Sequence, residues 1–206
     1  MLILIPARRN SKGFEFKNRR LLDHTMLDIP KKYLPRTYVS TDDEEIKERV
    51  SKICNVHDRS SEVSTDTAST LSLVKEFKRD VCPAEDEIIV MLYLTYPQRT
   101  FFEVEGVHSF FKRRNLKSLL CKKDVKVSPY LQMFDLGRGK GKQIIEHNLY
   151  RRQDYSKTFE ISHYISIFRA SEVDNLNNNM YNKDTYFYEI DDKIVDVDLE
   201  DDLMGI

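Results

Sequence analysis

Hydrophobic residues in the first 121 positions of the chain fall into two alternating patterns. Residues 2–5 form an unbroken apolar run that ends at Pro6, which predicts a buried strand opening into a loop. The longest such run, residues 88–94, predicts a central strand buried on both faces. Strands that alternate with single helices predict crossover connections and a mostly parallel sheet. Apolar residues recur at helical spacing between the runs, in residues 46–53, 71–81 and 104–111.

The second half of the chain departs from this pattern. Residues 122–160 are charged and irregular, so we expect a small arm or insertion there, with residues 137–142 at a hairpin tip. Strand-like residues return at 161–168, and residues 193–197 predict a late short strand. The whole pattern predicts one α/β domain over residues 1–206, with a Rossmann-like, mostly parallel sheet and flanking helices. Capping boxes predict helix starts and pair Ser40 with Asp43, Thr41 with Glu44, and Thr100 with Glu103.

The composition is that of a globular protein. Hydrophobic residues make up 40% and charged residues 33% of the 206 positions, so the chain can bury a sizeable core. The net charge of −1 argues against a general nucleic-acid binder, which usually carries a basic surplus. No apolar run is long enough to span a membrane, and the cysteines form no metal pattern. We therefore expect a cytoplasmic protein with reduced thiols and with neither nucleic acid nor membrane as a partner.

Charge is distributed unevenly along the chain. Residues 8–20 hold six bases against one acid, whereas residues 189–202 hold eight acids against one base. The basic loop follows the first strand, and ligands of parallel sheets bind at the carboxyl ends of strands. Phosphates need cations and backbone N–H groups at close range, and Gly13 permits such an approach. The loop has neither a Walker A sequence nor a G-x-G-x-x-G fingerprint, and a solvated basic loop is the alternative to a phosphate site.

The acidic end contains Asp196-Val197-Asp198. In a strand, both carboxylates would point to the same side. Mg²⁺ takes one or two carboxylates together with substrate phosphate oxygens, so this pair suits a magnesium site. A solvent-facing acidic tail is the alternative. The basic loop favours the metal, because a magnesium triphosphate would couple the two ends of the chain.

Two further polar stretches are candidates for ligand binding. Residues 59–70 combine one arginine, several hydroxyl groups and a small residue, which suits recognition of a ribose and a base. Arg151 and Arg152 are adjacent, and arginines can grip a carboxylate or phosphate with two hydrogen bonds. An ordinary polar loop and a solvated basic pair are the respective alternatives.

Taken together, these stretches resemble the acylneuraminate cytidylyltransferase family, the CMP-sialic acid synthetases. The resemblance implies a nucleotidyltransferase-type fold, CTP and an acidic sugar as substrates, and Mg²⁺ as cofactor. It also implies a homodimer in which the arm, about residues 122–160, helps to complete the sugar site of the other subunit. The similarity runs from residue 3 to about 203, and its stretches are residues 5–13 with 17–18, 39–46, 66–69, 95–100, 151–154 and 196–198.

The resemblance implies roles for individual residues. It assigns the catalytic cations as Arg8, Lys12 and Lys17. It assigns the nucleotide site as Ala7, Arg8, Ser11, Lys12, Gly13, Lys17, Asn18, Arg59, Ala68 and Thr70. It assigns the sugar site as Tyr93, Arg99, Arg151, Arg152 and Gln153. It assigns the ligands of the magnesium ion as Asp196 and Asp198. The expected reaction is attack by the anomeric hydroxyl of a sialic-acid-like sugar on the α-phosphorus of CTP, with release of pyrophosphate.

The sugar half of the chain departs from the family pattern more than the nucleotide half. The family usually has glutamine and proline where Tyr93 and Leu94 stand. After the run at 151–154 it usually has an arginine and then Asn-Gly-Ala, where this chain has Glu160 and residues 162–164 (Ser-His-Tyr). Two alternatives follow. One is a related nucleotidyltransferase that uses 3-deoxy-octulosonate or another acidic sugar, and the other is a catalytically inactive nucleotide-binding homologue.

Overall fold

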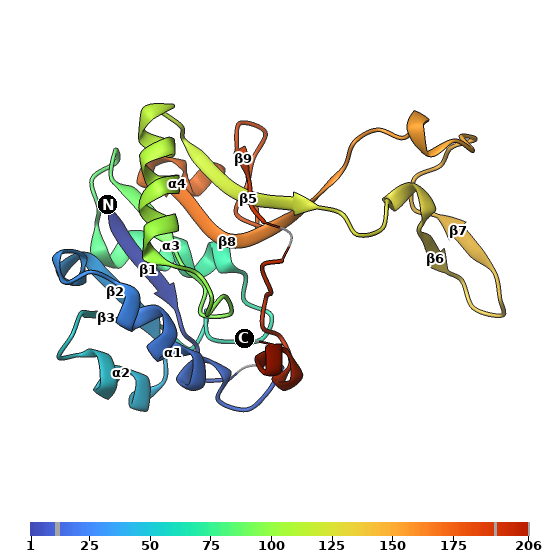
Figure 1. The fold of residues 1–206 in the computed structure, drawn as a ribbon. Coiled ribbons are helices and arrows are strands. Elements are labelled where there is room, and N and C mark those ends of the chain that lie inside the picture. Colours follow the sequence, from blue (N-terminus) through green and yellow to red (C-terminus); the bar gives the residue numbers. More distant parts are fainter. Residues whose placement is uncertain (11–12, 192, 206) are drawn as a thin grey trace.

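The computed structural model describes residues 1–10, 13–191 and 193–205, and its main body is one seven-stranded sheet (Figure 1). The strand order is β3-β2-β1-β4-β8-β5-β9. β1 pairs in parallel with β2 and β4, whereas β8 runs antiparallel to both β4 and β5. The predicted mostly parallel α/β sheet is therefore confirmed. The strands are β1 (Leu2–Pro6), β2 (Thr37–Thr41), β3 (Asn55–Asp58), β4 (Ile88–Met91), β5 (Ser118–Asp124), β8 (Phe159–Arg169) and β9 (Tyr186–Glu189).

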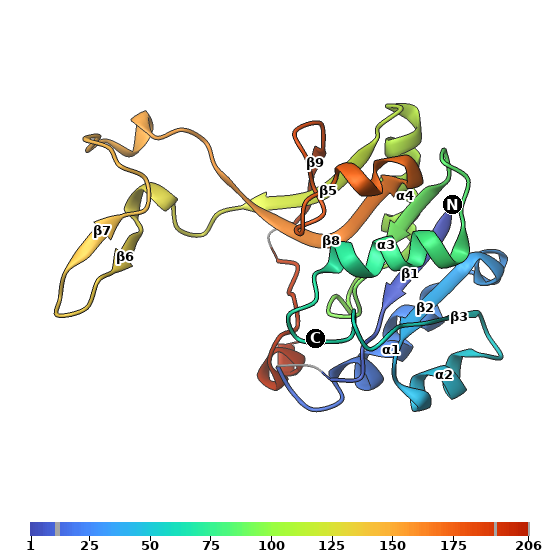
Figure 2. The ribbon, with the colours of Figure 1, turned by 180° about the vertical axis from the view of Figure 1, so that it is seen from behind.

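Helices cover both faces of the sheet (Figures 1 and 2). Alternate residues of β1 explain why both faces are apolar: Ile3 and Ile5 belong to the core cluster that includes residues of α1, α2 and α4. Leu4 lies on the other face in the cluster that includes Phe77 of α3. Each fully buried side chain of this size contributes roughly 1.5–3 kcal/mol to folding. The helices are α1 (Lys17–Asp28), α2 (Glu44–Val50), α3 (Thr70–Val81) and α4 (Phe101–Arg113).

The helix starts show which capping predictions hold. At α4, both hydrogen bonds of the capping box are present, as predicted: the Thr100 side chain accepts from the main chain of Glu103, and the Glu103 side chain accepts from the main chain of Thr100. The boxes predicted for residues 40–44 are wrong, because Asp43 is itself the N-cap of α2 and accepts from two main-chain N–H groups. Thr41 instead stays in β2, and its hydroxyl donates to the main-chain oxygen of Ala7.

The late strand predicted for residues 193–197 is also wrong. The last strand of the sheet is β9, which pairs in parallel with β5. The segment after it is extended but joins no ladder, and it is held by one main-chain bond of 2.8 Å from Val197 to Thr95. Val197 is fully buried while its acidic neighbours are exposed or partly exposed, so the segment seals the edge where β4 ends.

Residues 125–158 project from the main body as an extended arm (Figures 1 and 2). The arm carries the hairpin of β6 (Met133–Asp135) and β7 (Gly141–Gln143). The predicted hairpin tip is confirmed, because three successive residues from Gly137 to Gly139 have positive φ. Within the described residues, no helix combines the length and the apolar character needed to cross a membrane. The arm exposes large apolar side chains, among them Val127, Leu131, Met133, Phe134 and Leu136.

Candidate active site

A cavity of about 280 Å³ opens beyond the carboxyl ends of β1 and β4. This is the edge at which open α/β sheets bind their ligands. The cavity is also lined by Asp66 and by Tyr93, which follows β4. The residues of the predicted nucleotide site that line it are Arg8, Lys17, Asn18, Arg59, Ala68 and Thr70.

The loop after β1 brings Arg8 to the cavity. Its guanidinium forms an ion pair with Asp66 at 2.8 Å and donates to the main-chain oxygen of Thr65 at 3.2 Å. Asn18 holds the same loop by donating to the main-chain oxygen of Arg8 at 2.8 Å. Ala7 is buried and donates its N–H to Ser40, so it anchors the loop instead of lining the cavity. Ser11 and Lys12, also predicted here, lie outside the described residues.

Lys17 joins the two ends of the chain. This first residue of α1 is 7% exposed, and its ammonium donates to the main-chain oxygen of Val197 and to Oδ1 of Asp198, both at 3.1 Å. A buried ammonium is stable only when it is paired, so the contact fixes the acidic segment against the start of α1. The basic and acidic stretches therefore meet at one place, although they are 181 residues apart in sequence.

Gly13 is part of the same junction. A Cβ atom on this residue would lie 1.7 Å from the main-chain oxygen of Asp198 and 2.9 Å from its carbonyl carbon, with the ammonium of Lys17 at 3.6 Å. The sequence predicted that Gly13 admits a triphosphate. The structure adds a different reason for glycine, because no larger residue lets the loop approach the acidic segment this closely.

Asp196 and Asp198 fit a magnesium ion in their donor chemistry. One oxygen of Asp196 accepts from the Tyr96 hydroxyl at 2.9 Å, and one oxygen of Asp198 accepts from Lys17. Each carboxylate keeps a second oxygen that has no hydrogen-bond partner among the described residues. Mg²⁺ prefers hard oxygen donors, and Lys17, which pairs with Asp198, lines the cavity.

The loop between β3 and α3 forms the other wall of the cavity. Arg59 donates to the main-chain oxygen of Val63 at 2.9 Å, and burial lowers the pKa of its guanidinium. The buried Glu76 of α3 accepts from the main-chain N–H of Ser60 at 3.0 Å and from the Ser60 hydroxyl at 2.5 Å. These contacts hold Arg59 and the first part of the loop in place beside the cavity.

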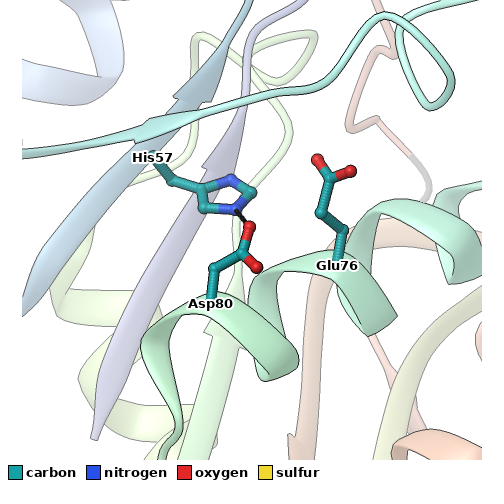
Figure 3. Close-up of side chains that lie close together, drawn as sticks. All are labelled: His57, Glu76 and Asp80. Carbon is teal, nitrogen blue, oxygen red and sulfur yellow. Dashed lines mark hydrogen bonds and ion pairs between the residues drawn. The ribbon is translucent and has the colours of Figure 1, made fainter.

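His57, Glu76 and Asp80 lie close together behind this loop (Figure 3). Their donor atoms lie within 4.8 Å of one another, as in a metal site. The His57 ring, however, bonds Ser40 at 2.9 Å through Nδ1 and Asp80 at 3.2 Å through Nε2. Since Glu76 is also bonded, to Ser60, we assign this cluster to the support of the loop.

Tyr93 and Arg99, both predicted at the sugar, have different surroundings. The Tyr93 hydroxyl shares a 2.8 Å hydrogen bond with Thr70 at the cavity, and burial raises the pKa of this phenol to about 12. Arg99 is buried and donates to the main-chain oxygens of Tyr164 at 2.7 Å and Tyr93 at 2.9 Å. Burial lowers the pKa of its guanidinium to about 10. In this chain Arg99 therefore supports the wall that carries Tyr93.

Arg151, Arg152 and Gln153 are not brought to the cavity by their own chain. They lie on the projecting arm, where they are exposed and Arg151 pairs with Asp154 at 2.9 Å (Figure 1). Sequence reasoning also missed residues at the cavity. Asp66 is the partner of Arg8, and Tyr96 orients Asp196. Both belong to stretches that the family resemblance marks, but only the fold shows what their side chains contact.

The chain is similar in sequence to known cytidylyltransferases. Residues 2–97 match the family model described as cytidylyltransferase. The chain is 25% identical over 217 aligned residues to an N-acylneuraminate cytidylyltransferase of Streptococcus agalactiae, covering 100% of this chain and 52% of that protein. It is 36% identical over 103 residues to the N-acylneuraminate cytidylyltransferase of Oncorhynchus mykiss, covering 46% of this chain and 23% of that protein. The chain thus spans about half the length of the bacterial relative.

Solved structures show the same fold. The complex of CMP:2-keto-3-deoxy-manno-octonic acid synthetase with CTP superposes with a TM-score of 0.66 at 15% identity, covering 99% of this chain and 95% of that one. The 4-diphosphocytidyl-2C-methyl-D-erythritol synthase of Anaerococcus prevotii gives 0.63 at 12% identity, with coverages of 99% and 95%.

The fold, with its cavity at the carboxyl edge of the sheet, is that of solved nucleotidyltransferase-type structures. Residues 2–97 match the cytidylyltransferase family model and the curated relatives are N-acylneuraminate cytidylyltransferases, which confirms the predicted resemblance to that family.

Proposed function

We propose that this protein transfers a cytidylyl group from CTP to the anomeric hydroxyl of an acidic keto sugar of the sialic-acid type and releases pyrophosphate. The observation that carries the proposal is the junction of Lys17 with Asp198 beside the cavity. It unites a cationic loop, suited to a triphosphate, with a carboxylate pair, suited to its metal ion. The curated relatives are N-acylneuraminate cytidylyltransferases, which supports both the nucleotide and the sugar class.

In the proposed reaction, the anomeric hydroxyl oxygen bonds to the α-phosphorus, and the bond from that phosphorus to the pyrophosphate oxygen breaks. The hydroxyl proton is lost, and pyrophosphate leaves with the bonding electron pair. Catalysis of phosphoryl transfer consists mainly of positioning and charge stabilisation. Arg8 and Lys17 line the cavity and would offset the charge of the leaving pyrophosphate. Lys12, which was assigned the same task, lies outside the described residues.

Asp196 and Asp198 would hold the magnesium ion. When bound, the ion polarises the α-phosphate and neutralises part of the triphosphate charge. Tyr96 would keep Asp196 oriented, because its hydroxyl donates to one carboxylate oxygen. Lys17 would hold Asp198 on the side that faces the loop after β1.

We further propose that two copies of the chain form a homodimer. Arg151, Arg152 and Gln153 lie on the arm, distant from the cavity of their own subunit (Figure 2). A second copy could receive this arm, so that Arg152 meets the carboxylate of the sugar bound to that copy. The exposed apolar residues of the arm support such a contact, since exposed apolar patches commonly mark interaction surfaces.

Pyrophosphate release with Mg²⁺ tests this function. We expect release from CTP in the presence of N-acetylneuraminate, and little release from ATP, GTP or UTP. Asp198→Asn should lower turnover by roughly 10²–10³-fold through loss of a metal ligand. The exposed Asp201, three residues further along, provides the control Asp201→Asn, which should retain near-normal turnover. Normal turnover in Asp198→Asn would refute the metal assignment.

Two other readings have a specific observation in their favour. The structural match to the octulosonate-type synthetase favours that keto acid as a second acceptor to be tested. The changed residues at Tyr93 and at 160–164 favour an inactive nucleotide-binding homologue. Binding of CTP without turnover of either acid would replace the proposed function by this second reading.

A further inference from the structure

His163 on β8 is a polar side chain that the site described so far does not use. Its Nδ1 atom is buried and lacks a hydrogen-bond partner, and among the described residues neither ring nitrogen has one. A polar atom that is buried without a partner destabilises the fold, because it has lost its hydrogen bonds to water. Such a cost is expected where a bound ligand supplies the missing partner.

The surroundings of His163 place it between the two halves of the site. Its ring packs edge-on against Tyr93, with 5.5 Å between ring centroids, and Tyr93 lines the cavity. The preceding residue, Ser162, lies 3.4 Å from the Tyr96 hydroxyl through its own hydroxyl, and Tyr96 in turn donates to Asp196 at 2.9 Å. His163 thus packs on a residue that lines the cavity and follows one that contacts the partner of the proposed metal ligand.

Resting on the proposed function, we infer that the imidazole of His163 binds a hydroxyl group of the sugar acceptor and helps to set which acceptor is used. The acceptor class is a polyhydroxylated keto acid. A neutral imidazole has one donor and one acceptor nitrogen, so it can bond a hydroxyl in either direction. Burial lowers the pKa of His163, which is consistent with a neutral ring.

The position also explains a departure from the family pattern. Where the family usually has a small Asn-Gly-Ala stretch, this chain has Ser162, His163 and Tyr164. The two neighbours are used inside the protein, since Ser162 is buried and Tyr164 donates to Glu103 at 2.8 Å. His163 alone of the three keeps its side-chain hydrogen-bonding groups unused. Together with Tyr93, it forms an aromatic wall that a sugar ring and its hydroxyls can contact.

The test compares variants that separate packing from hydrogen bonding. His163→Phe keeps a ring against Tyr93 but removes both nitrogens. His163→Asn and His163→Gln keep a polar group near Nδ1 and Nε2, respectively. The KM for N-acetylneuraminate and for 3-deoxy-manno-octulosonate is measured by pyrophosphate release, and the Kd for CTP with Mg²⁺ by calorimetry.

We expect His163→Phe to raise the acceptor KM roughly tenfold, the loss of about one hydrogen bond, with the Kd for CTP unchanged. At least one of the amide variants should recover most of this loss. An unchanged acceptor KM in His163→Phe, when the wild type turns over either acid, would overturn the inference and leave the proposed function standing. A wild type that turns over neither acid, or that does not bind CTP, would instead refute the proposed function and the inference with it.

A second readout does not depend on how well the variants fold. In wild-type protein with ¹⁵N-labelled histidine, the imidazole resonances of His163 are identified by their absence in His163→Asn. Addition of the acceptor in the presence of a non-hydrolysable CTP analogue should shift them, because a new hydrogen bond changes the shielding of the bonded nitrogen. Resonances that stay in place at saturating acceptor would count against the contact.

Discussion

Two residues near the cavity are constrained by the main chain that surrounds their side-chain positions. Gly13 illustrates this, because the main chain of Asp198 occupies the space that its side chain would need. Arg99 is a second case, since a charged side chain that suggested a substrate contact donates to two main-chain oxygens inside the fold. Arg99 supports the wall that carries Tyr93, and Gly13 leaves room for the acidic segment.

Substitution of Gly13 tests the junction of the two chain ends. Gly13→Ala should push the loop away from Asp198, because a Cβ atom cannot lie 1.7 Å from a carbonyl oxygen. We expect a Kd for CTP raised by at least roughly tenfold, about 1.4 kcal/mol, by calorimetry. Gly106→Ala is the matched control, since nothing lies within 4 Å of its Cβ position in α4. That change should stabilise the helix by up to about 1 kcal/mol. Equal CTP binding in both variants would contradict the junction.

Arg99 should contribute mainly to stability. Arg99→Met leaves the main-chain oxygens of Tyr164 and Tyr93 without their donor, so we expect the free energy of unfolding to fall by about 2–4 kcal/mol. Urea unfolding measures this change. Arg151→Met, which removes an exposed ion pair on the arm, should change the same quantity by less than about 1 kcal/mol. If the two losses were similar, Arg99 would not have the supporting role described here.

At the scale of elements, the site depends on how helices begin. α2 starts at Asp43, whose buried carboxylate accepts from Glu45, Ile46 and Arg19. Burial by itself raises the pKa of Asp43, but the hydrogen bonds from Arg19 and from the main chain outweigh it, so the pKa lies below its ordinary value. The same carboxylate therefore caps α2 and ties it to α1, the helix that carries Lys17.

This pKa shift predicts a pH dependence of stability. A carboxyl group with a depressed pKa stabilises the fold above the unfolded pKa of about 4, and this contribution is lost as the pH falls through the folded value. Asp43→Asn can still cap the helix but cannot pair with Arg19. Its free energy of unfolding should be lower than that of the wild type by about 1–3 kcal/mol at pH 7. The difference should narrow below pH 4 in urea titrations, and a gap that stays constant with pH would disprove the ionic contribution.

At the scale of the whole molecule, the position of the arm determines whether one chain can supply all residues of the proposed sugar site. The cavity lies on the main body, whereas Arg152 lies on the arm that projects from it (Figure 1). If the cavity and Arg152 belong to one sugar site, the Arg152 of that site must come from a second copy of the chain. Under the proposed function, the described residues assigned to the nucleotide all lie on the main body of one chain, so CTP binding should not depend on that copy.

Charged substitutions on the arm test this division. Met133→Glu combined with Leu136→Glu, at side chains 54% and 63% exposed, should convert a dimeric wild type to monomers. Light scattering after size exclusion measures the mass. The variant should keep its affinity for CTP but lose sugar turnover. Lys140→Glu at the exposed hairpin tip controls for the added charge and should remain dimeric. A monomeric wild type with full turnover would disprove the proposed dimer.

Much of the fold could be predicted because it follows from local patterns. The apolar run at 2–5 and the helical spacing at 71–81 report burial directly, and the capping box at Thr100 marks the start of α4. The late strand was misplaced, because an alternation of Asp with Val is equally compatible with an extended segment outside the sheet. β3 was not predicted, since its four residues are too few and too polar to produce a clear pattern.

By itself the sequence determined the class of this protein. Its strand and helix periodicity predicted the sheet, and its charged stretches, read together with the family resemblance, predicted the edge at which a nucleotide is expected to bind. Only the tertiary structure decided which side chains meet there. The contact of Lys17 with Asp198, the closeness of Gly13 to the acidic segment and the packing of His163 on Tyr93 all join residues distant in sequence. Local propensity contains no information on such pairs, because they form only when the packed sheet brings its loops to one edge.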